Sequence, residues 1–299
     1  MMKGTGSMPV VLDAFVGIST RNYLHRILQR TVLPTDNFTV ATIWPGSDRN
    51  EFTHFQTVVQ KVVNFCSGFS IDTEDSTDMT PNLKLKSQRQ NIICDQGSLA
   101  IVLSIVEKLV PVSEKFDTAR KGVGAKGMKF GSEEEKIVFE MGKGVLAACL
   151  SMIFAAIKGN ARNQMFVADF MQVLLKHANA QKLAAKCITE MLGTNMELQE
   201  LKIGVREINT FTSLLRASKM NSMYLQLLAA CCKCNERGVV GNQITVAEVF
   251  FKDHNDILIS IHVDQLKRTP VVFDNNNSGL YIPEKFAVHS PVLGENLIT

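Results

Sequence analysis

The sequence predicts an all-α protein of stacked helical hairpins, with a mixed N-terminal segment whose structure is harder to predict. Three observations support this fold class. Apolar residues recur at three- and four-residue spacing in most segments between residues 85 and 266, which is typical of amphipathic helices. The connections between these segments are short, as in stacked hairpins. A polar phrase also occurs twice, which indicates an internal repeat.

Composition excludes several classes of protein. The chain has 299 residues, of which 45% are apolar and 20% charged, and this composition is typical of a globular protein. A net charge of +3 is too small for a nucleic-acid-binding surface. The seven cysteines form no regular framework of pairs, which favours a reducing cytosol, and the N-terminus has no apolar run of signal-peptide length.

The N-terminal segment, residues 1–84, contains one clear element. Residues 51–66 place Phe52, Phe55 and Val59 on one helical face, so we expect a helix there. Before it lie a helical patch at 20–30 and an extended patch at 37–44. Residues 67–82 are acidic and poor in apolar residues, and they are interpreted as a solvated loop.

Residues 85–266 are predicted to form the helical solenoid, and residues 267–299 an extended or partly disordered tail. Ser98 is the expected N-cap of the helix after Gly97. The apolar run 144–157 has 14 residues, short of the roughly 18 to 20 that cross a bilayer, so we expect a buried helix and no transmembrane segment. The expected helices lie at 86–96, 99–110, 132–158, 161–178, 180–192, 196–203, 206–218, 220–235, 241–251 and 254–267.

The repeated phrase is Asn-Gln-x-x-Val-Ala followed by an acidic residue. It begins at Asn163 and again at Asn242, 79 residues later, about twice the 40 to 47 residues of an armadillo or HEAT repeat. Gly159 and Gly241 are expected to separate helices, and the Asn and Gln side chains to bond the backbone groups left open at helix ends. We interpret the phrase as a helix-boundary signature of an armadillo/HEAT-like solenoid.

Four stretches also resemble a known family. They are "RQNIICDQGSLAIVLSIVEKL" (89–109), "IKGNARNQMFVADF" (157–170), "EINTFTSLLR" (207–216) and "LLAACCKCNERGVVGNQITVAEVFF" (227–251). Their order and spacing resemble the homology module shared by ryanodine and inositol trisphosphate receptors, the RIH domain of intracellular calcium-release channels.

The resemblance implies a non-catalytic, armadillo-like cytosolic module of a ligand-gated calcium channel at the endoplasmic reticulum or a similar store. It implies that the module relays conformational change and docks other domains or subunits of a channel that is a homotetramer at full length. One copy of the family's module also supplies basic ligands to inositol trisphosphate. Carried onto this chain, those positions are Ser87, Asn91, Cys94, Asn160 and Arg162.

Of these positions only Arg162 is cationic, so the sequence argues for a relay and against ligand capture. Arg89, Lys84 and Lys86 are the residues that could join Arg162 in a smaller basic patch. Two alternatives stay open: a generic armadillo-type adaptor that binds extended peptides in a groove with polar ladders, and an inositol-phosphate-binding module.

No catalytic, metal or cofactor site is predicted. "GVGAKG" at 122–127 has the Gly-x-Gly-x-x-Gly spacing but no preceding strand, so it is interpreted as a loop. Cys231 and Cys234 are expected on one helix face as core thiols, because no second pair completes a zinc site. The six histidines form no evident catalytic constellation with Ser, Cys or Asp residues.

Overall fold

The all-α fold class is confirmed in a computed structural model. It describes residues 8–30, 49–68, 83–114, 133–217, 222–253, 260–263, 270–273 and 279–281. The helices are α1 (Met8–Arg30), α2 (Arg49–Cys66), α3 (Leu83–Asp95), α4 (Ser98–Lys108), α6 (Glu133–Ile157), α7 (Ala161–Ala168), α8 (Met171–His177), α9 (Lys182–Thr194), α10 (Met196–Lys202), α11 (Val205–Ala217), α12 (Ser222–Cys231) and α13 (Val240–Asp253). The strands are β1 (Lys233–Cys234), β2 (Arg237–Gly238), β3 (Ser260–Val263), β4 (Pro270–Phe273) and β5 (Gly279–Tyr281).

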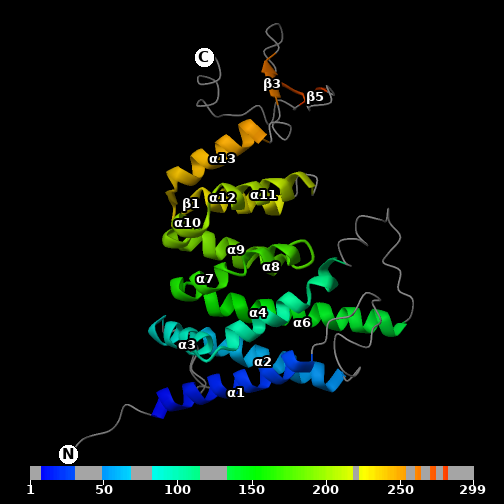
Figure 1. The fold of residues 1–299 in the computed structure, drawn as a ribbon, viewed down its shortest axis with the longest axis vertical. Coiled ribbons are helices and arrows are strands. Elements are labelled where there is room, and N and C mark those ends of the chain that lie inside the picture. Colours follow the sequence, from blue (N-terminus) through cyan, green and yellow to red (C-terminus); the bar gives the residue numbers. More distant parts are fainter. Residues whose placement is uncertain are drawn as a thin grey trace, which may run out of the picture. The chain divides into compact units, whose positions relative to one another are not determined.

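The chain divides into two compact units. The first unit comprises Met1–Ile203 and Ala229–Val239, and the second comprises Gly204–Leu228 and Val240–Thr299. Within the first unit the helices from α1 to α10 pack in succession, each burying its apolar face against its neighbours (Figure 1). This is how a solenoid hides faces that no single hairpin can bury alone.

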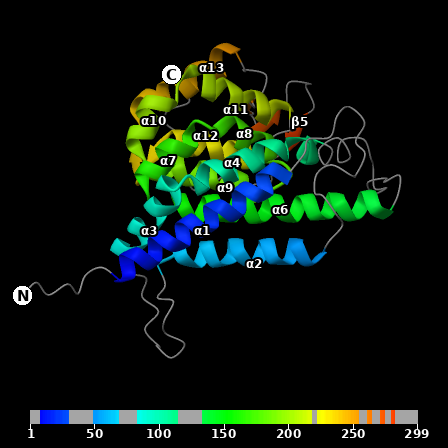
Figure 2. The ribbon, with the colours of Figure 1, turned by 60° about the horizontal axis from the view of Figure 1, so that its bottom comes forward.

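Helix α6 is the centre of the first unit. It packs against α2, α3, α4, α7 and α9, and Figure 2 shows it side by side with α2. The close approach of these two helices depends on Gly144, where an added Cβ would lie 2.5 Å from Cζ of Phe52. Leu146, Leu150 and Ile153 of α6 are fully buried.

The apolar part of α6 is longer than the sequence analysis expected. Phe139–Ile157, 19 residues, is long and apolar enough to cross a membrane, so the length argument against a transmembrane segment was wrong. Of the most apolar stretch of this helix, 56% is buried inside the protein, and the helix packs against five others. This packing is what a core helix requires.

Helix α1 is anchored to the unit by a buried ion pair. Arg89 Nε on α3 lies 3.2 Å from Asp13 Oδ2 on α1, and both side chains are only 8% exposed. The guanidinium also lies over the Phe65 ring of α2, 4.8 Å from its centroid. One cation therefore joins three helices. The expected patch at 20–30 is the C-terminal part of this longer helix, and the expected extended patch at 37–44 lies outside the described residues.

Two expected helix boundaries were wrong in the first unit. The helix expected over 161–178 breaks at Asp169 and Phe170, where Phe170 N bonds to Val167 O at 2.9 Å and tightens the end of α7 into a turn. Ser98 does not act as an N-cap: it is the first residue of α4 and is buried, and Gly97, at φ +77°, precedes it.

Further corrections concern the strands. Cys231 and Cys234 do not share a helix, because α12 ends at Cys231 and Cys234 belongs to the β1–β2 hairpin. The helix expected over 254–267 is also wrong where the structure describes it, since Ser260–Val263 forms β3. That stretch alternates apolar and polar residues, which fits a strand, and β3 pairs antiparallel with β4.

The second unit contains α11 packed against α13, and the three-stranded antiparallel sheet β3-β4-β5. In α11 the buried residues Ile208, Phe211 and Leu215 follow helical spacing, as predicted. Strands β4 and β5 lie in the segment 267–299, so these parts of the expected tail are extended. Residues 69–82 and 122–127, the rest of the expected acidic loop and the glycine-rich loop, lie outside the described residues.

Candidate functional site

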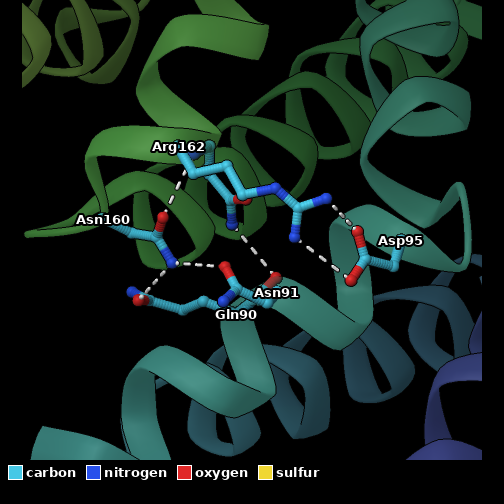
Figure 3. Close-up of polar contacts among 6 residues, drawn as sticks. Gln90, Asn91, Asp95, Asn160 and Arg162 are labelled. Carbon is cyan, nitrogen blue, oxygen red and sulfur yellow. Dashed lines mark hydrogen bonds and ion pairs between the residues drawn. The ribbon is translucent and has the colours of Figure 1, made fainter.

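A network of buried side-chain amides joins the helices at one edge of the first unit. Asn160, in the turn between α6 and α7, donates through Nδ2 to Asn91 Oδ1 at 2.9 Å and to Gln90 Oε1 at 3.3 Å, both on α3 (Figure 3). Gln90 Nε2 in turn donates to the carbonyl oxygens of Ala155 and Lys158, at 2.7 and 3.1 Å. Ala155 lies in the last turn of α6 and Lys158 directly follows the helix, so neither carbonyl has a donor within the helix. Helix α3 thus closes the C-terminal end of α6.

The same turn is fixed from the side of α7. Asn160 is the N-cap of α7, and its Oδ1 accepts from Asn163 N at 3.1 Å. Asn163 Nδ2 then donates to the carbonyls of Gln90 and Ala156, at 3.0 and 2.9 Å. Gly159, at φ +70°, makes the turn before the cap. The first copy of the repeated phrase is therefore a helix-boundary signature.

Gln164 extends the network to the next hairpin. Its Nε2 donates to Ile157 O at 3.1 Å and to Thr194 Oγ1, at the end of α9, at 2.9 Å. The Gln164 side chain is 1% exposed. On the same side, Glu190 Oε1 of α9 accepts from Gly159 N at 3.0 Å. The end of α6 is thereby tied to the end of α9.

This arrangement recurs 35 residues later, at a place that the sequence analysis missed. Asn195 is the N-cap of α10: its Oδ1 accepts from Leu198 N at 3.0 Å, and its Nδ2 donates to Ala161 O at 3.1 Å. Gln199 Nε2 donates to three carbonyl oxygens, those of Leu192 at 2.5 Å, Ala230 at 3.0 Å and Lys233 at 3.2 Å. The shared signal is Asn-x-x-x-Gln, present as Asn160 to Gln164 and as Asn195 to Gln199.

The second copy of the repeated phrase occupies the same place on its helix but has a different environment. Asn163 and Asn242 are both the third residue of a helix, α7 and α13. Asn242 is buried at 8% exposure, yet Gln243 is exposed whereas Gln164 is not. Gly241 lies in the first turn of α13 and does not end a helix, contrary to expectation. The phrase therefore lies at a helix start in both copies, and its glutamine is buried only in the first.

Arg162 is engaged within the protein. Its guanidinium makes two contacts with the Asp95 carboxylate at the end of α3, 2.6 Å from Nη2 to Oδ1 and 3.2 Å from Nη1 to Oδ2 (Figure 3). The hydrogen bond to Asp95 raises the pKa of Arg162, and both side chains stay largely exposed, at 61% and 49%. An anionic ligand at Arg162 would have to compete with this carboxylate.

The other three predicted basic residues, Arg89, Lys84 and Lys86, all lie on α3. Arg89 is buried in the ion pair with Asp13. Lys84 is exposed and Lys86 half-buried on the first turn of α3. Lys86 lies beside the α6–α7 turn, since its Nζ is 3.7 Å from the position that a Cβ added to Gly159 would take. Burial lowers the pKa of Lys86, and the nearby charge of Lys158 lowers it further.

One Ser–His pair, which the sequence did not reveal, lies in the core. His177 Nε2 is 2.8 Å from Val106 O, so this nitrogen carries the proton, and Nδ1 accepts from Ser113 Oγ at 2.8 Å. Both side chains are 0% exposed, and burial lowers the pKa of His177 to about 4. The pair is inaccessible to substrate, and it links α8 to α4 and the helical residues 110–114.

Five of the seven cysteines are buried in the first unit, whereas Cys94 and Cys232 are half-buried. Burial raises the pKa of Cys66 and of Cys149 to about 12, so neither is a ready thiolate nucleophile. Across the described ranges, no three His, Cys, Asp or Glu side chains gather in an arrangement that could hold a metal ion.

Comparison with known families agrees with the four stretches that carried the resemblance. Residues 56–263, more than two thirds of the chain, match the RIH domain. The match begins within α2 and runs through α3 to α13 into β3, so it includes the whole amide network. This chain belongs to the RIH domain family, the homology module of ryanodine and inositol trisphosphate receptors.

Proposed function

We propose that this chain is a non-catalytic cytosolic module of an intracellular ligand-gated calcium-release channel. In this role it relays conformational change between other domains of the channel and docks against them, at the cytosolic face of the endoplasmic reticulum or a similar calcium store. Family membership supports the channel context. The amide network supports the relay.

The observation that carries the proposal is that one set of side chains bonds consecutive helix ends. Asn160 holds α3 and α7 together, Gln164 reaches α9, and Gln199 reaches the backbone at Ala230 and Lys233. A tilt of one hairpin therefore displaces hydrogen-bond partners on the next. Coupling of this kind needs a contiguous set of packed and bonded groups, and these residues supply one.

The relay is tested in the full channel with Gln164→Met and Gln199→Met together. Both substitutions keep side-chain length and remove the donors that join the hairpins. Calcium release from stores is recorded against agonist concentration, and channel assembly and single-channel conductance are measured separately. We expect normal assembly and conductance with a shifted agonist response.

The control is Gln172→Met, which changes an exposed glutamine on α8 of the same unit. Its agonist response should equal that of the unmodified channel. An unchanged response in the double variant, with assembly intact, would contradict the relay.

Inositol phosphate binding is a second candidate, which the lysines near the α6–α7 turn favour. Lys86 and Lys158 lie close enough for the charge of Lys158 to lower the pKa of Lys86. Two neighbouring ammonium groups of this kind can donate to one phosphate. Against it stand the pairing of Arg162 with Asp95 and of Arg89 with Asp13. Calorimetric titration with inositol trisphosphate, repeated on Arg162→Ala, tests it: micromolar binding that is lost in the variant would support a ligand site.

The adaptor alternative has no comparable observation in its favour. A peptide-binding armadillo groove presents side-chain amides to the peptide backbone. Asn160, Asn163, Gln164 and Gln199 are instead at most 5% exposed and donate to groups of this same chain.

A further inference from the structure

Thr194 combines an exposed position with a bond to the buried amide network. It is the last residue of α9, and it is exposed to solvent. Its Oγ1 donates to Glu190 O at 2.6 Å and accepts from Gln164 Nε2 at 2.9 Å. Thr189 on the same helix is also exposed, but its Oγ1 bonds within α9, to Ala185 O at 3.0 Å. Thr194 is therefore a place where an enzyme in solution can act on the joint between α7 and α9.

The backbone around Thr194 is open on both sides. A Cβ added to Gly193 would have nothing within 4 Å. Asn195, which follows, is extended, at φ −127° and ψ 97°, and α10 begins only at the next residue. Exposed junctions between helices open locally at a lower cost than helix interiors do. An enzyme that binds an extended substrate chain therefore has little helix to unwind here.

The sequence around Thr194 is acidic. Residues 187–201 contain three glutamates and no Lys, Arg or His. Glu197, the third residue after Thr194, is exposed. Protein kinases select their substrates partly by the charges around the target hydroxyl. Ser104 and Thr245 also precede a glutamate by three residues, but both are half-buried within helices.

We propose that Thr194 is a phosphorylation site for an acidophilic protein kinase, and that phosphorylation opens the joint between α7 and α9. In the reaction Thr194 Oγ1 attacks the γ-phosphorus of a nucleoside triphosphate. The bond from Oγ1 to phosphorus forms, and the bond from that phosphorus to the β,γ-bridging oxygen breaks. The nucleoside diphosphate leaves, and the hydroxyl proton passes to the base of the kinase. This modification goes beyond the proposed relay and does not rest on it.

Phosphorylation removes a donor and adds charge where charge is unfavourable. The phosphothreonine Oγ1 carries no hydrogen, so it cannot donate to Glu190 O. The phosphate carries a charge of about −1.5 to −2 at pH 7 and lies at the C-terminal end of α9, the negative end of the helix dipole. The Glu190 carboxylate, four residues earlier on the same face, repels it. Because Glu190 Oε1 also accepts from Gly159 N at 3.0 Å, both bonds from α9 to the α6–α7 region are weakened.

The closed joint should slow the modification. Thr194 Oγ1 is bonded to two groups in the closed state, so the kinase acts on chains in which the junction has opened locally. Gln164→Met removes one of these bonds, and it should speed phosphorylation by roughly two- to tenfold, the factor for one hydrogen bond. Gln172→Met, at an exposed position on α8, should leave the rate unchanged.

Kinase treatment followed by tandem mass spectrometry tests the site. Acidophilic kinases are first tested with ATP on a synthetic peptide of residues 188–201, and a kinase that modifies it is then used on the folded chain. The chain should gain phosphate on Thr194, and the control Thr189→Val should gain it at the same rate. A peptide that these kinases leave unmodified, or a folded chain without phosphate on Thr194, would overturn the proposal. A rate in Gln164→Met no higher than in Gln172→Met would overturn the opening step.

Urea unfolding before and after kinase treatment tests the effect of the phosphate. The midpoint should fall when Thr194 is phosphorylated and return after treatment with a phosphatase. Thr194→Val, treated with the kinase in the same way, is the control for phosphates on other residues, and its midpoint should not change. A phosphorylated chain as stable as the unmodified one, or an equal fall in Thr194→Val, would overturn the proposal.

Discussion

Gln164 offers the sharpest test of the network, because its amide nitrogen makes two defined bonds. Gln164→Met removes the donors to Ile157 O and Thr194 Oγ1, at 3.1 and 2.9 Å, and keeps the length of the side chain. Both acceptors keep other partners, since Ile157 O also accepts from Asn160 N and Thr194 Oγ1 donates to Glu190 O. The cost is then the net worth of two hydrogen bonds, about 1–3 kcal/mol.

Urea unfolding measures this cost. With a slope of about 3 kcal/mol per molar, the midpoint should fall by about 0.3–1 M. Gln172→Met is the control, since Gln172 is an exposed glutamine on α8 of the same unit. Its unfolding free energy should stay within about 0.5 kcal/mol of that of the unmodified chain. Equal shifts in the two variants, or none in Gln164→Met, would show that the two buried bonds add no stability.

Three further predictions concern packing, charge and pH. Gly144→Ala should lower the unfolding free energy by about 1–3 kcal/mol, because the added Cβ meets the Phe52 ring. Gly193→Ala, where an added Cβ has nothing within 4 Å, should leave stability unchanged or raise it by up to about 1 kcal/mol. Thermal melts of the two variants measure the difference. Asp13→Ala should lower the unfolding free energy by about 3–5 kcal/mol, because it removes a carboxylate that pairs with the buried Arg89 cation. The double variant Asp13→Ala, Arg89→Met should recover part of this loss. A double variant less stable than Asp13→Ala would contradict the prediction. The pKa of His177 is about 4 in the folded chain against an ordinary 6.5, so between these pH values the unfolded chain binds a proton that the folded chain does not. The free energy of unfolding should therefore fall by up to about 3 kcal/mol as the pH drops from 6.5 to 4. Urea titrations over this pH range should show that His177→Ala loses this part of the pH dependence.

Helical periodicity was sufficient for most of the fold because each helix buries one face. The spacing of Ile208, Phe211 and Leu215 located α11, and the same pattern located α2. The break between α7 and α8 was not predictable in this way, since no Gly or Pro marks it and the apolar pattern continues through Phe170. Strand β3 was missed although Ile259, Ile261 and Val263 alternate with polar residues, because its pairing with β4 depends on a distant segment.

In the candidate site, the sequence predicted only the contacts between residues close together along the chain. The phrase at Asn163 and Gln164 correctly indicated a helix boundary, since side chains that bond helix ends act over a few residues. Gln90 joins the network from 70 residues before Asn160, and no local pattern marks it. The ion pairs of Arg162 with Asp95 and of Arg89 with Asp13 were not predictable either, because each carboxylate comes from a different helix from its arginine.

Hydrogen exchange can detect whether the amide network couples successive hairpins. Backbone exchange is followed by mass spectrometry in the unmodified chain, in Gln164→Met and in the control variant Gln172→Met. We predict that Gln164→Met speeds exchange in α9 and α10 as well as in α7, because its bond to Thr194 joins these elements. Faster exchange confined to α7, with α9 and α10 as protected as in Gln172→Met, would contradict the coupling.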